Sequence, residues 1–128
     1  MTSQFQALSL SHSNTPLHVR ETFALNQDQL KNFSLKVKDL FKINDLLIVS
    51  TCNRTEIYYS SEKDLSTELI KSLTAEKGLL DYSLYAPFFQ NHNGTDAVKR
   101  LFEVASGLQS KVVGDLQIPN QVKQADHW

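Results

Sequence analysis

Several residue types are scarce in this sequence, and each scarcity excludes a class of structure. The 128 residues include one cysteine, so no disulfide can form within the chain, which is typical of a protein in a reducing cytoplasm. The four glycines are isolated, and none belongs to a Gly-x-Gly-x-x-Gly pattern. The chain therefore cannot build a dinucleotide-binding loop of its own.

The sequence also lacks an excess of charge of one sign and a long apolar run. The 13 lysines and arginines are balanced by 14 acidic residues, which excludes a basic coat that grips nucleic acid through its phosphates. No apolar run is long enough to cross a membrane, and the polar residues 1–6 lack the features of a signal peptide. Together with the chain length, these absences predict one soluble domain over residues 1–128.

The hydrophobic pattern alternates between strand-like and helix-like segments. Short apolar or β-branched runs predict strands at residues 4–10, 46–49, 56–60 and 84–90. Helical spacing and capping residues predict helices at 15–20, 26–43, 61–78 and 95–106, with another helical pattern around 121–125. We expect the last strand to lie at a sheet edge, because Pro87 cannot donate to a ladder.

This order of elements predicts a fold class. Two β-α-β halves joined by a hairpin describe a ferredoxin-like split βαβ (β-α-β-β-α-β) sandwich of the α+β class, followed by extra C-terminal helices. An antiparallel four-stranded sheet with helices on one face is the simplest way to bury the apolar stripes. The stripes that we expect to be buried are Leu30, Phe33, Val37, Leu40 and Phe41; Leu65, Leu69 and Leu73; and Val98, Leu101, Phe102 and Ala105.

The cysteine lies between two predicted strands, so we expect it at the tip of a turn. A lone thiol on an exposed turn, with Arg54 two residues from Cys52, is placed to act as a nucleophile. Two simpler interpretations remain open. The first is that Cys52 is a small buried side chain, as free cysteine usually is, although its polar neighbours argue against burial. The second concerns Arg54, which can be a solvated arginine of the turn or can bind a carboxylate.

The histidines give weaker signals. No pair among His12, His18, His92 and His127 has metal-ligand spacing, and no second cysteine is available, so we expect no metal site. Histidines in such positions are usually at the surface. His92 is the best candidate for an accessory acid or base, because it lies in a predicted loop.

Residues 50–58, Ser-Thr-Cys-Asn-Arg-Thr-Glu-Ile-Tyr, resemble the signature of the glutamyl-tRNA reductase family. Three further stretches agree in order. Residues 12–21 resemble the family's N-terminal stretch with its His, Pro and Arg-Glu. Residues 104–110 are similar to Val-Ala-Ser-Gly-Leu-Asp-Ser, and residues 113–123 to Gly-Glu-Pro-Gln-Ile and Gly-Gln-Val-Lys. The resemblance covers the family's N-terminal catalytic domain, and implies that the NADPH-binding and dimerisation domains lie outside these 128 residues.

The resemblance implies an NADPH-dependent oxidoreductase of tetrapyrrole (5-aminolevulinate) biosynthesis. A thiolate at Cys52 would attack the ester that joins glutamate to tRNA(Glu), and hydride from NADPH would reduce the thioester to glutamate-1-semialdehyde. It also implies a homodimer formed through another domain, and a product handed to the next enzyme of the pathway. The implied substrate contacts are Thr51, Cys52, Asn53, Arg54, Ser110, Asp115, Leu116, Gln117 and Gln121.

The chain departs from the family pattern at one position of direct chemical importance. Arg100 stands where the family has an active-site histidine, and arginine cannot act as a general base because it keeps its proton. Arg100 could instead stabilise an oxyanion, and His92 is a candidate replacement base. Asp115 stands for the family's glutamate, Leu116 for its proline and residues 119–120 for Leu-Gly.

A function of another class remains open. A ferredoxin-like domain can also serve small-molecule binding or protein interaction, in a homologue that has lost catalysis. On that hypothesis Cys52 is incidental, and Asp115 and Gln117 belong to a polar connector. Fast alkylation of Cys52 below neutral pH would favour the enzyme, since a bystander thiol reacts slowly there.

Overall fold

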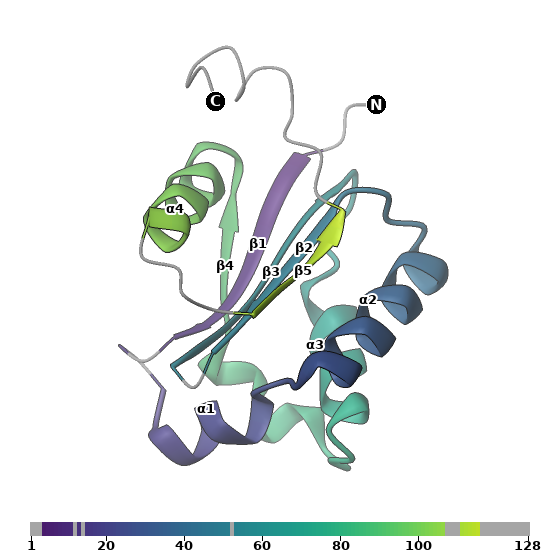
Figure 1. Cartoon of the computed structure of the whole chain (residues 1–128), viewed down its shortest axis with the longest axis vertical. Coiled ribbons are helices and arrows are strands. Elements are labelled where there is room, and N and C mark those ends of the chain that lie inside the picture. The colour runs from purple at the N-terminus through teal and green to yellow at the C-terminus, as the bar shows by residue number, and fades with distance from the viewer. Residues whose placement is uncertain (1–3, 12, 14, 52, 107–110, 116–128) are drawn as a thin grey trace.

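The computed structural model describes residues 4–11, 13, 15–51, 53–106 and 111–115, with the backbone alone described at 11 and 111–115. Helices and strands alternate through these residues (Figure 1). The elements are β1 (Gln4–Ser11), α1 (Leu17–Phe23), α2 (Gln27–Phe41), β2 (Leu46–Ser50), β3 (Arg54–Ser61), α3 (Ser66–Glu76), the 3-10 helices η1 (Tyr82–Leu84) and η2 (Ala86–Phe88), β4 (Gln90–Asn93), α4 (Gly94–Ser106) and β5 (Lys111–Asp115).

The sheet confirms the predicted architecture and adds a strand to it. Its order is β4-β1-β3-β2-β5, and each neighbouring pair is antiparallel. The first four strands have the 4-1-3-2 order of a ferredoxin-like split βαβ. Residues 111–115, for which no strand was predicted, form a fifth strand, in which Val112 and Val113 pair with Val49 and Ile48 of β2. β-Branched residues suit such a pleated edge.

The predicted strand at residues 84–90 is wrong. Most of that segment folds into η1 and η2, and the edge strand begins only at Gln90. Asp81 initiates the first 3-10 turn by accepting a hydrogen bond from the Ser83 amide at 3.0 Å, and Pro87 lies in the second turn. β4 itself is polar, Gln-Asn-His-Asn, so its pattern gave no strand signal.

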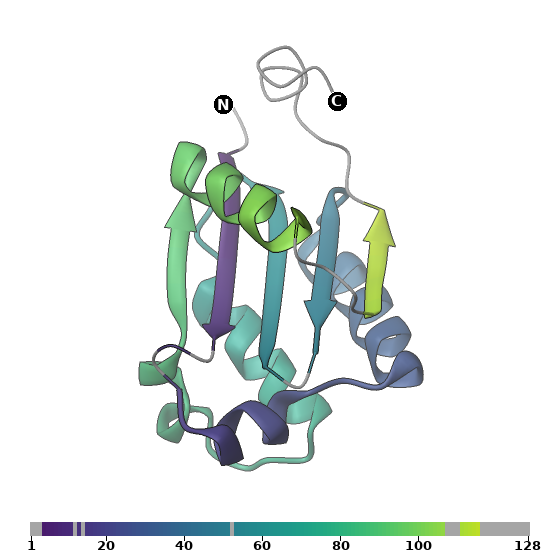
Figure 2. The same cartoon turned by 60° about the vertical axis from the view of Figure 1, so that its left-hand side comes forward.

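Helices cover both faces of the sheet, and the expectation of one covered face is wrong. The views of Figures 1 and 2 place α2 and α3 on one side and α4 on the other, and α1 at the lower end of the sheet. The buried residues of α1 belong to the cluster under α2 and α3, so we call this side the α1–α3 face. The α1–α3 face carries the larger apolar cluster, which includes Phe23, Phe33 and Leu69. The α4 face carries a smaller one, in which Ala97, Leu101 and Val104 pack with Phe5, Ala7, Val49 and Tyr58.

The helix stripes follow the predictions in part. Asn26 and Gln29 form a capping box at the start of α2, where Leu30, Phe33 and Val37 are buried, but Leu40 is exposed. The predicted helix start at Ser61 is wrong: α3 begins at Ser66, although Leu65, Leu69 and Leu73 are buried as expected.

The buried stripe of α4 is rotated from the prediction. Its buried residues are Ala97, Leu101 and Val104, whereas Ala105 is exposed and Val98 and Phe102 are only partly buried. Both stripes satisfy a helical period, so periodicity alone could not choose between them. The rotation matters for the site, because Arg100 lies three residues after Ala97 and so on the sheet-facing side of the helix.

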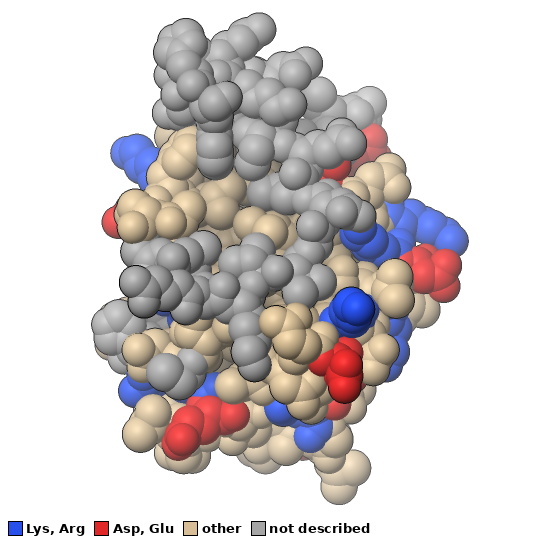
Figure 3. Space-filling view, viewed as in Figure 1, with Lys and Arg blue, Asp and Glu red and all other residues tan. Residues whose placement is uncertain are grey.

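Two observations bear on membranes and charge. Among the described residues, no helix combines the length and the apolarity that a membrane crossing requires. On the face shown in Figure 3, acidic and basic side chains are interspersed among the described residues, without a broad area of one sign.

Candidate functional site

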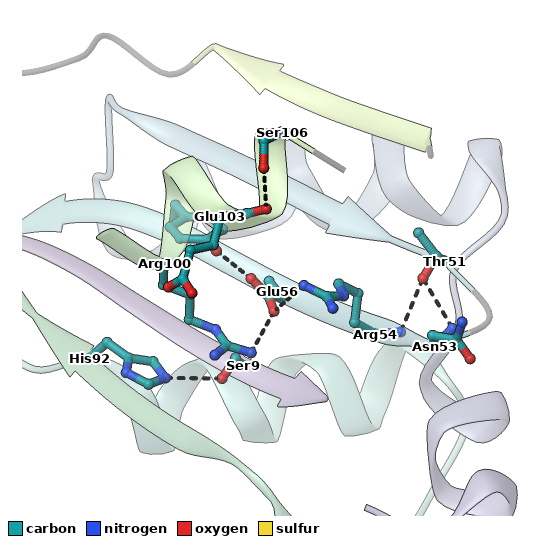
Figure 4. Close-up of polar contacts among 10 residues, drawn as sticks. Ser9, Thr51, Asn53, Arg54, Glu56, His92, Arg100, Glu103 and Ser106 are labelled. Atoms are coloured by element: carbon teal, nitrogen blue, oxygen red, sulfur yellow. Dashed lines mark hydrogen bonds and ion pairs between the residues drawn. The ribbon is translucent and has the colours of Figure 1, made fainter. Parts of the chain in front are cut away.

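The turn between β2 and β3 is closed by one side chain. Thr51 Oγ1 accepts hydrogen bonds from the backbone amides of Asn53 (3.0 Å) and Arg54 (3.1 Å), and the Thr51 amide donates to the Arg54 carbonyl at 2.8 Å (Figure 4). The predicted hairpin turn is therefore confirmed. Cys52 itself lies outside the described residues, so the position of its thiol stays a prediction.

The segment around α1 holds this turn from the side. Arg20 donates from one terminal nitrogen to Asn53 Oδ1 at 3.1 Å and from Nε to the Thr15 carbonyl at 3.1 Å. Arg20 thus ties α1 to the residue that directly follows Cys52. Two more hydrogen bonds fasten the base of the hairpin, from Thr55 Oγ1 to the Phe23 carbonyl (3.2 Å) and from the Leu25 amide to Ser50 Oγ (2.9 Å).

A buried carboxylate lies two residues into β3, on the α4 face of the sheet. Glu56 is fully buried, and its Oε2 lies 2.8 Å from a terminal nitrogen of Arg100 and 3.7 Å from one of Arg54. Its Oε1 accepts a hydrogen bond from the Tyr58 hydroxyl. Figure 4 shows the two arginines approaching the same carboxylate from α4 and from the start of β3. Glu56 therefore links the predicted substrate-binding arginine to the residue at the family's histidine position.

The charges in this cluster do not balance. Arg54 and Arg100 carry two positive charges and are partly exposed, whereas Glu56 supplies one negative charge on a side chain that is shielded from water. Arg100 Nε is buried and has no hydrogen-bond partner among the described residues. Burial, followed by the nearby Glu56 carboxylate, raises the pKa of the Tyr58 hydroxyl far above its ordinary value, so Tyr58 stays a neutral donor. The cluster thus has a local excess of positive charge.

His92 lies on the same face but away from the turn. Its Nε2 is 3.3 Å from Ser9 Oγ. Partial burial and then the charge of Arg100 lower the pKa of His92, against opposing contributions from Glu56 and Asp96. His92 is therefore a neutral imidazole at neutral pH.

The sheet register separates His92 from the cysteine turn. His92 pairs with Ala7, whereas Arg54 at the turn pairs with Ser11, four residues further along β1. Four strand residues span roughly 13 Å. The structure thus brings Arg100 and Arg54 to one carboxylate and leaves His92 at a distance from the turn.

The other predicted contacts are not gathered at the turn by the described backbone. Asp115 pairs with Leu46, at the end of β2 that is opposite to Ser50 and the turn. Ser110, Leu116, Gln117 and Gln121 lie outside the described residues. The roles proposed for these residues stay predictions.

Four residues of the site, Glu56, Tyr58, Ser9 and Arg20, were not predicted from the sequence. Glu56 and Tyr58 were assigned only to a return strand, and Ser9 only to the first strand. One signal was present: a glutamate in the interior of a strand rich in Ile and Tyr must either face water or be paired, and on a covered sheet only pairing is possible.

Two features bear on whether the described residues could hold a metal ion or a dinucleotide. Within them, no group of three or more His, Cys, Asp or Glu side chains could hold a metal ion. Gly78 ends α3 with φ +72° and Gly94 starts α4 with φ +54°, so each serves a helix end. Dinucleotide-binding sheets are mostly parallel with a glycine-rich first turn, whereas this sheet is antiparallel throughout. The residues present therefore do not fit a nicotinamide dinucleotide.

Comparison with known proteins gives a consistent result. A family model described as the N-terminal domain of glutamyl-tRNA(Glu) reductase matches residues 8–128. A glutamyl-tRNA reductase of Cytophaga hutchinsonii is 47% identical over 129 residues, covering 100% of this chain and 30% of that protein. One from Legionella pneumophila (strain Corby) is 37% identical over 121 residues, covering 94% of this chain and 28% of that protein.

A solved structure of glutamyl-tRNA reductase from Methanopyrus kandleri superposes with a TM-score of 0.59 at 24% identity, covering 83% of this chain and 23% of that one; this likeness supports the fold alone. The chain spans about 30% of the length of the curated relatives that it matches. Because the family model covers nearly the whole chain and the C. hutchinsonii relative is 47% identical over all of it, the chain belongs to the glutamyl-tRNA reductase family, as its N-terminal domain.

Proposed function

We propose that this chain is the catalytic domain of an NADPH-dependent glutamyl-tRNA reductase, and that it performs the acyl transfer of that reaction. The observation that carries the proposal is the turn at residues 51–54, which Thr51 closes and Arg20 holds from outside. In the sequence, Cys52 lies between Thr51 and Asn53, and Arg54 carries a positive charge two residues away. A positive charge near a thiol favours the reactive thiolate.

The chemistry is a transfer of the glutamyl group from oxygen to sulfur. The Cys52 thiolate attacks the ester carbonyl carbon and forms a tetrahedral intermediate with a new carbon–sulfur bond. The bond from that carbon to the ribose oxygen of tRNA(Glu) then breaks, and the ribose oxygen takes a proton from solvent water. The products are a glutamyl thioester on Cys52 and free tRNA. Arg54 would bind the side-chain carboxylate of the glutamyl group, because its planar fork matches that geometry.

The proton acceptor for the thiol cannot be the side chain at position 100. Arg100 keeps its proton, and its short contact is to Glu56 rather than to the turn. His92 is neutral, but the sheet register places it four strand residues away from the turn. The cationic surroundings of the turn would instead lower the pKa of the thiol, so that the thiolate forms in solution before substrate binds.

The reduction requires a group that this chain does not fit. In this family NADPH supplies the hydride that turns the thioester into glutamate-1-semialdehyde, and a domain outside these 128 residues would bind it. The proposal extends to a homodimer formed through a further domain and to delivery of the product to the next enzyme of tetrapyrrole synthesis. Neither the binding of the glutamyl group nor its transfer to Cys52 depends on these parts.

A mass and deacylation experiment tests the acyl transfer. Mixing the chain with glutamyl-tRNA should give a glutamyl adduct on Cys52, which neutral hydroxylamine removes, together with slow release of free glutamate. Cys52→Ala should give neither product, whereas Lys99→Met, which removes a charge from α4, should behave as wild type. If wild type and Cys52→Ala release glutamate at equal rates and neither carries an adduct, the proposal is wrong.

A further inference from the structure

The distances from Glu56 Oε2 to the two arginines show which of them is its hydrogen-bond partner. Oε2 is at hydrogen-bond distance from Arg100, 2.8 Å, but at 3.7 Å from Arg54. The longer separation exceeds that of a hydrogen bond. Arg100 is therefore the hydrogen-bond partner of Oε2, whereas Arg54 contacts it only as a longer ion pair.

The other carboxylate oxygen also has a hydrogen-bond donor. Glu56 Oε1 accepts from the Tyr58 hydroxyl, and the whole side chain is excluded from solvent. The other groups facing the cluster are neutral His92 and Ser9 from β4 and β1, and the more distant carboxylate of Asp96 acts on His92. No group among these would compete with Arg100 for Glu56.

We propose that Arg100 is a positioning residue for the acyl transfer: by binding Glu56 at short range, it prevents that carboxylate from closing on Arg54, whose guanidinium thus stays available to the substrate's carboxylate. The inference rests on the proposed function, in which Arg54 binds that carboxylate. It assigns to the residue at the family's histidine position a role that needs no proton transfer. It also explains the excess positive charge, since the incoming carboxylate balances it.

The first test removes the Arg100 charge at similar side-chain length. In Arg100→Met, Glu56 retains only Arg54 as a cationic partner, and the two should close into a tight pair. We expect the glutamyl-tRNA concentration for half-maximal thioester formation to rise about tenfold or more, because a charge-assisted contact to substrate is lost. The maximal rate should change little. Lys99→Met on the same helix is the matched control and should change neither quantity.

The second test adds Glu56→Gln to that variant. Without a carboxylate to attract it, Arg54 is free again, so the half-saturating concentration of the double variant should fall most of the way back to the wild-type value. If Arg100 only supported the fold, the double variant would be at least as impaired as the single one. Arg100→Lys, which keeps the charge but has no planar fork, should lie between wild type and Arg100→Met.

A third measurement detects the Arg54–Glu56 pair without any reaction. The side-chain Nε–H signal of Arg54 in an NMR spectrum can be assigned by its loss in Arg54→Lys. It should shift, and its exchange with solvent should slow, in Arg100→Met but not in the double variant or in Lys99→Met. An Arg54 signal in Arg100→Met that matches wild type would overturn the inference, even if thioester forms normally. A wild-type chain that forms no thioester would overturn the proposed function, whereas the Arg54 signal would still decide the pairing.

Discussion

The two faces of the sheet are built from the same strands and have opposite chemistry. On β3, Glu56 and Ile57 are adjacent and both are buried, yet Glu56 meets two arginines under α4 whereas Ile57 joins the large apolar cluster under α1–α3. Side chains alternate along a strand, so one strand can serve both faces. The α1–α3 face thus holds the larger apolar core, whereas the α4 face carries the charges that we propose to act in binding.

Burial contributes differently to stability on the two faces. Burying an aromatic ring stabilises the fold through the area removed from water, whereas a buried ion pair often contributes little net stability because its charges lose hydration. A charged cluster on the α4 face therefore needs another explanation than stability. Placement of Arg54 beside the Cys52 turn provides one.

The largest expected effect lies on the α1–α3 face. Phe33→Ala removes a fully buried ring from the large cluster and should lower the free energy of unfolding by about 3–5 kcal/mol, measured by urea denaturation. Leu35→Ala, two residues away on the same helix but 68% exposed, should change it by no more than about 0.5 kcal/mol. Similar losses in the two variants would contradict the assignment of the core to this face.

The next effect lies on the α4 face. Glu56→Gln keeps the size of the side chain but leaves Arg54 and Arg100 without their shared anion. We expect a loss of about 2 kcal/mol, below the range for fully buried pairs because both arginines are partly exposed. The same denaturation experiment on Glu62→Gln, an exposed site after β3, provides the control. A stabilised Glu56→Gln would mean that the cluster is not an ion pair in solution.

A smaller effect should appear at the turn. Arg20→Ala removes the hydrogen bond to Asn53 at an exposed position, so the free energy of unfolding should fall by only about 1 kcal/mol or less. Hydrogen exchange at the amides of Asn53 and Arg54 should nevertheless become faster. Lys36→Ala, which breaks the exposed pair with Glu76, should leave both amides unchanged. Unchanged exchange in Arg20→Ala would show that α1 does not hold the turn.

The smallest effect concerns pH. Because the pKa of His92 is lower in the folded chain than its ordinary value of 6.5, the unfolded chain binds more protons between the two values. The His92 contribution to stability is therefore present above about pH 6.5 and is lost as pH falls through the folded pKa. His92→Gln should unfold with less loss of stability between pH 7.5 and about pH 5 than wild type does. His18→Gln, on an exposed site of α1, should follow wild type. An equal loss in His92→Gln and wild type would show that burial and the Arg100 charge do not lower the pKa of His92.

The sequence predicts the sheet order better than it predicts the faces. The apolar runs of β1, β2 and β3 and the hairpin between β2 and β3 follow from periodicity and turn residues. β4 was missed because Gln90–Asn93 has no apolar residue and pairs only as an edge. The orientation of α4 was missed because two stripes fit one helical period, and the sheet surface that selects between them is formed by distant residues.

Only the part of the site that is contiguous in sequence could be predicted. The cysteine motif is contiguous, so its turn could be located from nine residues of sequence. The Glu56–Arg100 pair joins residues 44 positions apart, and it exists only once α4 packs on the sheet. No local pattern carries that information.

The most direct test of Arg54 as the substrate-binding residue beside Cys52 is a competition between two substrates. The chain is mixed with equal amounts of glutamyl-tRNA and glutaminyl-tRNA, and the mass of the Cys52 adduct is measured. We expect a hydroxylamine-sensitive glutamyl adduct in wild type, little glutaminyl adduct, and loss of this preference in Arg54→Gln. Equal labelling by both substrates in wild type, or an unchanged preference in Arg54→Gln, would contradict that role.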